Sequence, residues 1–107
     1  MSGRTDFIKR CVAAGNVFWS YHSNMRLGQH AITRQDVLQS VEHCEIIEDY
    51  ADDTPLPSCL CLGNDSHGEP IHYVVAMDEA GRNIRFVTVY RPDTNKWQSD
   101  FRRRSRQ

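Results

Sequence analysis

Residues Ile71 to Trp97 read I-H-Y-V-V-A-M-D-E-A-G-R-N-I-R-F-V-T-V-Y-R-P-D-T-N-K-W. β-branched and aromatic residues, which favour strands, are concentrated in this stretch. The segment from Glu79 to Asn83 interrupts them with a glycine, as turns do. The stretch therefore predicts two long strands joined by a turn at the centre of a sheet. A Pro-Asp turn then leads to a predicted short amphipathic helix, in which Trp97 and Phe101 are four residues apart.

The chain has 107 residues, of which 39% are hydrophobic and 25% are charged. This length is enough for one domain with a single modest core. The formal net charge of −1 gives no strong positive field of the kind that many nucleic-acid-binding proteins carry. The charges are nevertheless uneven. One segment is an acidic block that comprises Glu42, Glu45, Glu48, Asp49, Asp52 and Asp53. The other is a basic C-terminal tail that comprises Arg102, Arg103, Arg104 and Arg106. We expect one domain over residues 1–107, with a compact part over about 5–101 and a solvated tail over 102–107.

The sequence contains no apolar run of the ~18 residues that a membrane span needs, and its N-terminus lacks the apolar region of a signal peptide. We therefore expect a cytoplasmic protein without membrane contact, in a reducing compartment. The cysteines at positions 11, 44, 59 and 61 are then expected to be free thiols, and no cofactor is expected. Zinc sites usually use CxxC or HxxxH spacings, and neither occurs here. A metal site at Cys59 and Cys61, with His43 and Cys44 as further ligands, remains an alternative.

The rest of the chain predicts an α+β domain in which N-terminal helices precede most of the strands. Helical spacing and capping residues predict three helices, over residues 5–14, 22–30 and 33–44. Two further strands are predicted over residues 45–50 and 58–62. Val17-Phe18-Trp19 is a short β-like run that leads in from the first helix. Because the connections between the later strands are short, we expect the helices to pack on a four-stranded antiparallel meander.

A set of short motifs follows these elements in order. They are Tyr21-His22, Arg26-Leu27, Ile32-Thr33, Asp36-Val37, Ile46 to Tyr50, Leu62-Gly63, Pro70 to Val75, and Thr88 to Asp93, ending at Trp97. In this order and spacing, over about residues 17–101, the sequence resembles a bacterial domain-of-unknown-function family, numbered forty-two fifty-eight. It departs from the family's pattern at His30, where Arg is usual, and at Ala31, where Gly is usual.

The resemblance carries expectations about fold and activity. The family has been grouped with RelE-like proteins of the barnase–colicin–RelE fold, which are often RNases or toxin components encoded beside an antitoxin. The resemblance therefore implies a helix pair packed on a four-stranded antiparallel sheet. It also implies a ribonuclease site where His22 and Arg26 meet the sheet.

Metal-independent RNA cleavage requires a base for the 2′-OH proton, an acid for the leaving 5′-oxygen, and a cation for the charged phosphorane. Histidine suits the first two roles because its pKa lies near neutrality, and arginine suits the third. The candidate catalytic residues are His22 and His72 as base and acid, Arg26 and Arg91 as phosphate clamp, and Thr88 or Tyr90 as hydrogen-bonding helper. Structural interpretations also exist: His22 could cap its helix, His72 could be a half-buried strand residue, and Arg91 could bond loop carbonyls.

Three functions from different classes remain open at this stage. The first is a RelE-like, metal-independent ribonuclease or toxin component of a toxin–antitoxin pair, with RNA and an antitoxin-like protein as partners. The second is a catalytically inert protein-interaction module of the same fold, which the balanced charge and His30 favour. The third is a small metal-binding protein that uses Cys59, Cys61 and nearby histidines.

Overall fold

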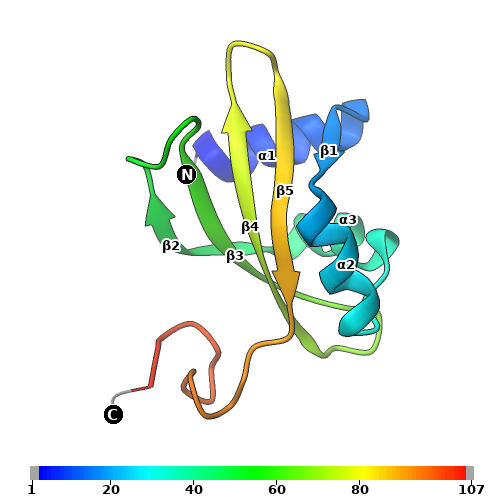
Figure 1. Cartoon of the computed structure of the whole chain (residues 1–107), viewed down its shortest axis with the longest axis vertical. Coiled ribbons are helices and arrows are strands. Elements are labelled where there is room, and N and C mark those ends of the chain that lie inside the picture. The colour runs from blue at the N-terminus through cyan, green and yellow to red at the C-terminus, as the bar shows by residue number, and fades with distance from the viewer. Residues whose placement is uncertain (1–2, 106–107) are drawn as a thin grey trace.

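The structure is a computed structural model that describes residues 3–105. Its elements, in chain order, are α1 (Gly3–Ala14), β1 (Val17–Trp19), α2 (Tyr21–Gln29), α3 (Arg34–Ser40), the 3-10 helix η1 (Val41–His43), β2 (Glu45–Tyr50), β3 (Ser58–Asn64), β4 (Pro70–Asp78) and β5 (Asn83–Tyr90). The strands of this part of the chain form one five-stranded sheet in the order β1-β5-β4-β3-β2 (Figure 1). No helix among the described residues is both long enough and apolar enough to cross a membrane.

The expectation of a four-stranded antiparallel sheet is wrong, although the domain is α+β overall. Strands β2 to β5 form an antiparallel meander, but β1 adds a fifth strand that runs parallel to β5. Val17 pairs with Ile84, and Trp19 pairs with Phe86 and stacks on its ring at a centroid distance of 4.5 Å. This β-like run was expected only to lead in from the first helix and was given no partner strand. Its true partner is the last strand.

The predicted C-terminal helix is also wrong. Residues 91–105 form turns and one antiparallel bridge, between Trp97 and Arg104. Backbone bonds from Gln98 N to Arg103 O and from Ser105 N to Lys96 O, each 2.8 Å long, close this small loop. The segment is rich in Asp, Asn, Ser and Thr, which compete with helical hydrogen bonds through their side chains. The four-residue spacing of two aromatic residues did not overcome this preference.

Helices α1 and α3 cover one face of the sheet, which we call the inner face. The core between them comprises Ile8 and Cys11 from α1, Val37 from α3, Val41 from η1, and Cys59, Cys61, Tyr73, Val75 and Phe86 from the strands, all at most 4% exposed. The helix α3 begins with the capping box expected from Thr33 and Asp36: each donates a backbone N–H to the other's side chain. The region that was predicted as one helix over 33–44 is α3 followed by η1.

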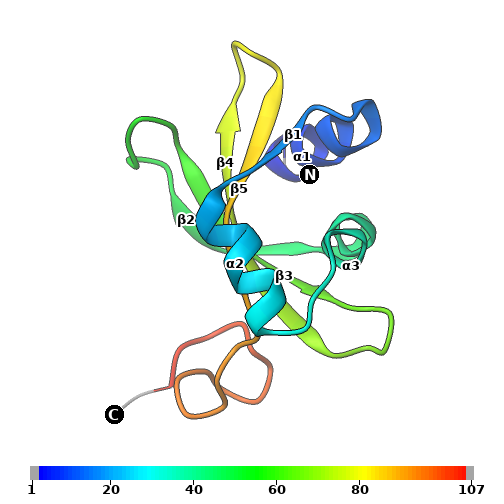
Figure 2. The same ribbon diagram turned by 45° about the vertical axis from the view of Figure 1, so that its right-hand side comes forward.

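Helix α2 lies along the edge of the sheet beside β5 (Figure 2). Ser20 sets its position, because its N–H donates to Phe86 O at 3.1 Å and its hydroxyl donates to Val87 O at 2.8 Å. The same hydroxyl accepts from Ser23 N at 3.0 Å and so caps the helix. One residue therefore joins the end of β1, the start of α2 and the middle of β5.

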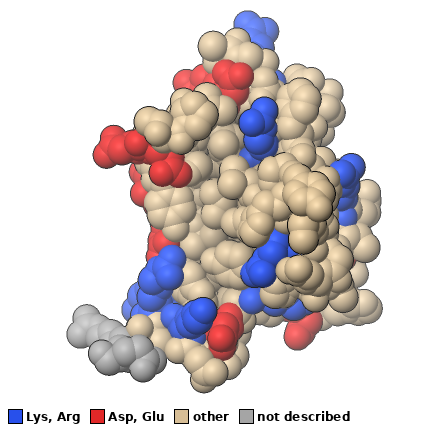
Figure 3. All heavy atoms as spheres, in the orientation of Figure 1, with Lys and Arg blue, Asp and Glu red and all other residues tan. Residues whose placement is uncertain are grey.

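The opposite side of the sheet, the outer face, carries three rows of cross-strand neighbours. These rows are Ser58–Ala76–Arg85, Leu60–Val74–Thr88 and Leu62–His72–Tyr90, each taken in the order β3, β4, β5. The C-terminal loop covers His72 in the third row through Phe101 and Trp97. In the orientation of Figure 1 this face points toward the viewer, and Figure 3 shows acidic side chains along its β2 side and basic ones near the C-terminal loop.

Candidate functional site

Helix α2 presents two of the candidate residues one turn apart. His22 is exposed, and Arg26 is half-buried beside the outer face of the sheet. The Nε atom of Arg26 is buried and has no hydrogen-bond partner. Its Nη1 atom donates to Gln29 Oε1 at 3.4 Å, which is a long bond. Buried donors almost always have partners in folded proteins, so the unpaired Nε of Arg26 is an exception among the described residues.

Tyr90 lies on the outer face within the electrostatic reach of Arg26. Burial raises the pKa of the Tyr90 hydroxyl, and the nearby cations Arg104 and Arg26 oppose part of that increase. The hydroxyl is therefore neutral at physiological pH. Thr88 shares the outer face with Tyr90, is half-buried, and pairs with Val74 across β4.

His72 is fully buried and both of its ring nitrogens are engaged. Nε2 lies 2.8 Å from Phe101 O, and Nδ1 lies 3.2 Å from the Tyr90 hydroxyl. A carbonyl oxygen can only accept, so Nε2 carries the proton and Nδ1 accepts from Tyr90. Trp97 approaches the imidazole edge-on at a centroid distance of 4.5 Å. Burial lowers the pKa of His72, although the Phe101 carbonyl and Glu48 both favour its protonated form. This geometry makes His72 a partner of Tyr90 and keeps it from direct contact with a substrate.

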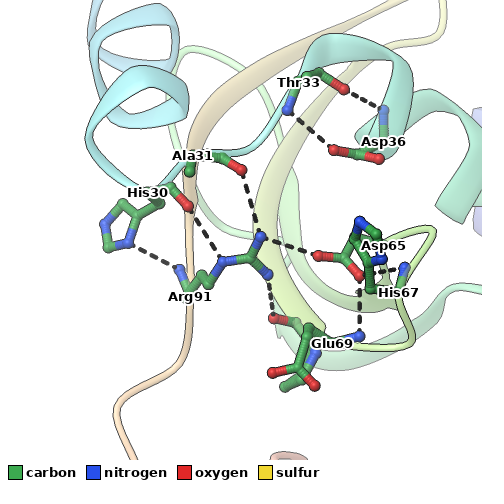
Figure 4. A network of polar contacts seen from close by, with 9 residues as sticks. His30, Ala31, Thr33, Asp36, Asp65, His67, Glu69 and Arg91 are labelled. Carbon is green, nitrogen blue, oxygen red and sulfur yellow. Dashed lines mark hydrogen bonds and ion pairs between the residues drawn. The ribbon is translucent and has the colours of Figure 1, made fainter.

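The side chain of Arg91 is held by contacts away from Tyr90 and His72. Its Nε donates to His30 O at 3.2 Å, its Nη1 and Nη2 atoms donate to Pro70 O and Ala31 O at 3.5 Å, and Nη2 forms a 2.9 Å ion pair with Asp65 (Figure 4). Arg91 thus ties the α2–α3 connection to the β3–β4 turn. The structural interpretation offered for this arginine, bonding to loop carbonyls, matches these contacts.

His30 and Ala31 lie beside this arginine. Nδ1 of His30 accepts from Arg91 N at 3.4 Å, and burial together with the nearby cations Arg26 and Arg91 lowers the pKa of His30. Ala31 adopts φ of 54°, a left-handed conformation that favours glycine.

Sequence reasoning missed a network next to His72 that joins the acidic block to the basic tail. Arg104 donates to both carboxylate oxygens of Glu48, at 2.8 and 3.0 Å, and its guanidinium lies over the Trp97 ring at 4.7 Å. The Tyr50 hydroxyl donates to the same carboxylate. The Arg104 hydrogen bond lowers the pKa of Glu48, whereas burial and Glu48 raise the pKa of Tyr50 to about 12. The opposite charges of the two segments were the available signal.

The tail expected to be solvated is exposed but ion-paired over its described part. Arg102 binds Glu45 through two bonds of 2.7 and 2.9 Å, and Arg103 pairs with Asp100 at 2.8 Å. Arg106 lies outside the described residues. Together with Arg104, these pairs fold the loop back onto β2 and bring Phe101 to His72.

Two hollows on the described part of the surface were compared with the positions of the candidate residues. The larger, about 810 Å³, lies between α1 and the β4–β5 turn, and none of the six candidate residues lines it. The smaller, about 320 Å³, lies on the outer face and is lined by Val74, the cross-strand neighbour of Thr88. None of the six candidate residues lines the smaller hollow either, but it adjoins Thr88 through Val74.

The metal-binding alternative receives no support from the cysteines. Cys59 and Cys61 are fully buried under the helices with their Sγ atoms 3.8 Å apart, and all four cysteines are free thiols. Within residues 3–105, no group of three or more His, Cys, Asp or Glu side chains is placed to hold a metal ion.

The sequence matches one protein family, described as "Domain of unknown function (DUF4258)", over residues 19–91. The match runs from the end of β1 to the residue after β5, so it includes α2 and all the candidate residues. Neither the search of curated proteins nor that of solved structures returned a significant match.

Proposed function

The chain belongs to the DUF4258 family of unknown function, and we propose that it is a metal-independent endoribonuclease that acts as the toxin component of a toxin–antitoxin pair. The observation that carries the proposal is that Arg26 has no carboxylate partner among residues 3–105, lies within electrostatic reach of Tyr90, and is one helical turn from the exposed His22. A phosphate is the ligand that best satisfies such a guanidinium, because arginine binds phosphate oxygens through two parallel N–H groups.

In the proposed reaction Arg26 binds the scissile phosphate and stabilises the charge that develops on the phosphorane. Five of the other described arginines are ion-paired, namely Arg4, Arg91, Arg102, Arg103 and Arg104. Arg26 has no carboxylate partner among residues 3–105, so its charge is available to a ligand. Its partly buried position also reduces the screening that a surface cation would experience.

Tyr90 and His72 would act together as the base. The Tyr90 oxygen accepts the 2′-OH proton while its own proton moves to Nδ1 of His72, which leaves the hydroxyl neutral and the imidazole positively charged. The Phe101 carbonyl and the Glu48 carboxylate, which favour protonated His72, would stabilise this state. His72 is thus a positioning residue and proton acceptor behind Tyr90. The exposed His22 would supply the proton to the leaving 5′-oxygen.

The test is RNA cleavage by the purified protein in EDTA, compared with single variants. Arg26→Ala should reduce the rate by about 10²- to 10³-fold, the usual effect of removing one electrostatic stabiliser. His22→Ala and Tyr90→Phe should each reduce it by at least about 10²-fold, as loss of an acid or base does. Arg10→Ala removes an exposed arginine from a helix on the inner face and should leave the rate unchanged. Absence of cleavage by the parent protein would overturn the proposal.

A second candidate, the inert interaction module, is favoured by a different observation. Phe18, Tyr21, Met25 and Val87 are 54%, 81%, 45% and 37% exposed and lie on β1, α2 and β5, which are adjacent. Apolar side chains that share one edge are typical of protein contacts. If the parent protein does not cut RNA, while Tyr21→Ser prevents binding to the product of an adjacent small open reading frame, this function replaces the ribonuclease.

A further inference from the structure

The hollow on the outer face has polar groups at opposite sides of an apolar floor. Ser58, Ala76 and Arg85 are cross-strand neighbours on β3, β4 and β5. Because adjacent strands lie about 4.8 Å apart, the two ends of this row are about 10 Å apart. The hollow measures about 320 Å³ and lies above the row, under the β2–β3 loop.

Aliphatic side chains form its floor and one wall. Val74, Ala76 and Val87 lie along the strands, and Pro55 and Leu56 come from the β2–β3 loop. Ala76 is 8% exposed and has the smallest of these side chains, so it intrudes least into the hollow. A surface of this kind suits the face of a planar ring, which loses its contact with water without needing a hydrogen bond from the floor.

A carboxylate lies at the β3 end of the row. The Ser58 hydroxyl donates to Oδ2 of Asp53 at 2.6 Å and holds that side chain at the rim of the hollow. No Lys or Arg among the described residues forms an ion pair with Asp53. Its remaining lone pairs can accept hydrogen bonds from a ligand.

A guanidinium lies at the β5 end. Arg85 is exposed, lines the hollow, and has no ion pair within residues 3–105. A ligand that fills the hollow would therefore present donors toward Asp53 and acceptors toward Arg85. Guanine has this pattern, with N1–H and the N2 amino group on one edge and the O6 and N7 acceptors on another, whereas adenine places an amino group beside its N7. Cytosine and uracil have a single ring and are too short to reach both ends.

The hollow adjoins the proposed cleavage site. Val74 lines it and pairs with Thr88, and Tyr90 follows two residues later on the same face, about 7 Å further along the strand. We infer that this hollow is a guanine-binding subsite for single-stranded RNA, which places the sugar–phosphate of the bound nucleotide toward Thr88, Tyr90 and Arg26. The inference rests on the proposed function for its substrate class, but the binding itself does not require cleavage.

The experiment titrates the ¹⁵N-labelled protein with the 5′-monophosphates of guanosine, adenosine, cytidine and uridine, and follows the amide signals by NMR. Guanosine monophosphate should bind about 10- to 100-fold more tightly than the other three, the discrimination that a good two-sided set of base contacts provides. It should shift the signals of Ala76 and Val87. Equal binding of all four nucleotides, or no binding, overturns the inference.

Two variants and one matched control locate the contacts. Asp53→Asn retains the shape of the side chain and should remove the preference for guanosine. Ala76→Leu fills the floor and should weaken the binding of all four nucleotides by at least about 10-fold. Asp52→Asn changes the neighbouring exposed acid, which does not line the hollow. It should change neither the preference for guanosine nor the affinity for the four nucleotides. A normal thermal unfolding midpoint shows that each variant is folded.

The outcomes separate this inference from the proposed function. If guanosine monophosphate binds as described but RNA is not cut, the subsite stands and the ribonuclease does not. If RNA is cut without a preference for sequences containing guanine, and Asp53→Asn has no effect on the choice of site, the ribonuclease stands and the subsite is excluded. A hollow that receives a protein side chain would show no nucleotide-induced shifts, which also overturns the subsite.

Discussion

His72 and Tyr90 face each other across β4 and β5, and Nδ1 of the imidazole lies 3.2 Å from the tyrosine hydroxyl oxygen. The other ring nitrogen donates to the Phe101 carbonyl at 2.8 Å, so the tautomer is determined and the Tyr90 proton points to His72. The C-terminal loop thereby sets the hydrogen-bond state of a residue on the outer face. This hydrogen bond connects the buried His72 with the proposed chemistry at Tyr90.

The buried His72 should make the stability of the fold depend on pH. Burial lowers its pKa below the ordinary value of 6.5, so the unfolded chain binds this proton more readily than the folded chain does. The contribution of neutral His72 is therefore complete above about pH 6.5 and is lost as the pH falls toward the folded-state pKa. Urea unfolding between about pH 7 and about pH 5 should show a steeper loss of stability for the parent than for His72→Gln. Equal slopes would contradict the assignment of a buried, neutral imidazole.

The contacts of Arg91 predict a structural cost when it is removed. Arg91→Ala should lower the free energy of unfolding by about 2 kcal/mol, within the range for hydrogen bonds to charged groups and reduced because the side chain is 32% exposed. Arg103→Ala is the matched control, since that arginine is 72% exposed and pairs with Asp100 three residues away; its change should be close to zero. Chemical denaturation measures both. A normal stability for Arg91→Ala, combined with loss of RNA cleavage, would instead make Arg91 a substrate contact.

Gly63 on β3 has no room for a side chain. A Cβ atom there would lie 2.7 Å from Ser40 Oγ and 2.8 Å from Ser40 Cβ. Ser40 is also fixed, because it donates to Val37 O at 2.7 Å and lies 2.8 Å from the Tyr73 hydroxyl. Gly63→Ala should therefore destabilise the protein by about 1–3 kcal/mol, the usual effect of overpacking. The double variant with Ser40→Gly should recover part of that loss relative to Ser40→Gly alone, and a strictly additive result would show that the clash is elsewhere.

Ala31 occupies a backbone conformation that costs an L-residue about 1–2 kcal/mol, whereas glycine gains entropy in the unfolded chain worth about 0.4–1 kcal/mol. Ala31→Gly should thus stabilise the protein by roughly 0.5–1 kcal/mol. The opposite substitution three residues earlier, Gly28→Ala, lies in α2 with nothing within 4 Å of the new Cβ and should stabilise by a similar amount through helix propensity. A lower melting temperature for Ala31→Gly would contradict the strain at this position.

Local patterns were sufficient for much of the fold. Alternation in Ile71 to Tyr90 predicted the two central strands, β4 and β5, and Thr33 with Asp36 predicted the start of α3 through its capping box. These features depend on neighbours within a few residues. The parallel pairing of β1 with β5 could not be predicted in this way, because the two segments lie far apart in the chain and β1 has only three residues.

The candidate site was predictable in its residue types and less so in its geometry. Strand alternation places His72, Thr88 and Tyr90 on one face, and helical periodicity places His22 and Arg26 together. The sealing of His72 depends on Trp97 and Phe101, which the sequence suggested would be helical. Arg91 is not part of the candidate site because it forms an ion pair with Asp65 in the β3–β4 turn. Sequence periodicity does not predict such a contact between loops.

The most direct test of the central claim is the chemistry of the cut RNA ends. A short RNA that contains one 2′-deoxynucleotide is incubated with the purified protein in EDTA, and the products are analysed by mass spectrometry. We predict 2′,3′-cyclic phosphate ends at the ordinary nucleotides and no cut on the 3′ side of the 2′-deoxynucleotide, because the attacking hydroxyl is missing there. Products with 5′-phosphate ends that appear only with added Mg²⁺, or no products at all, would contradict a metal-independent ribonuclease.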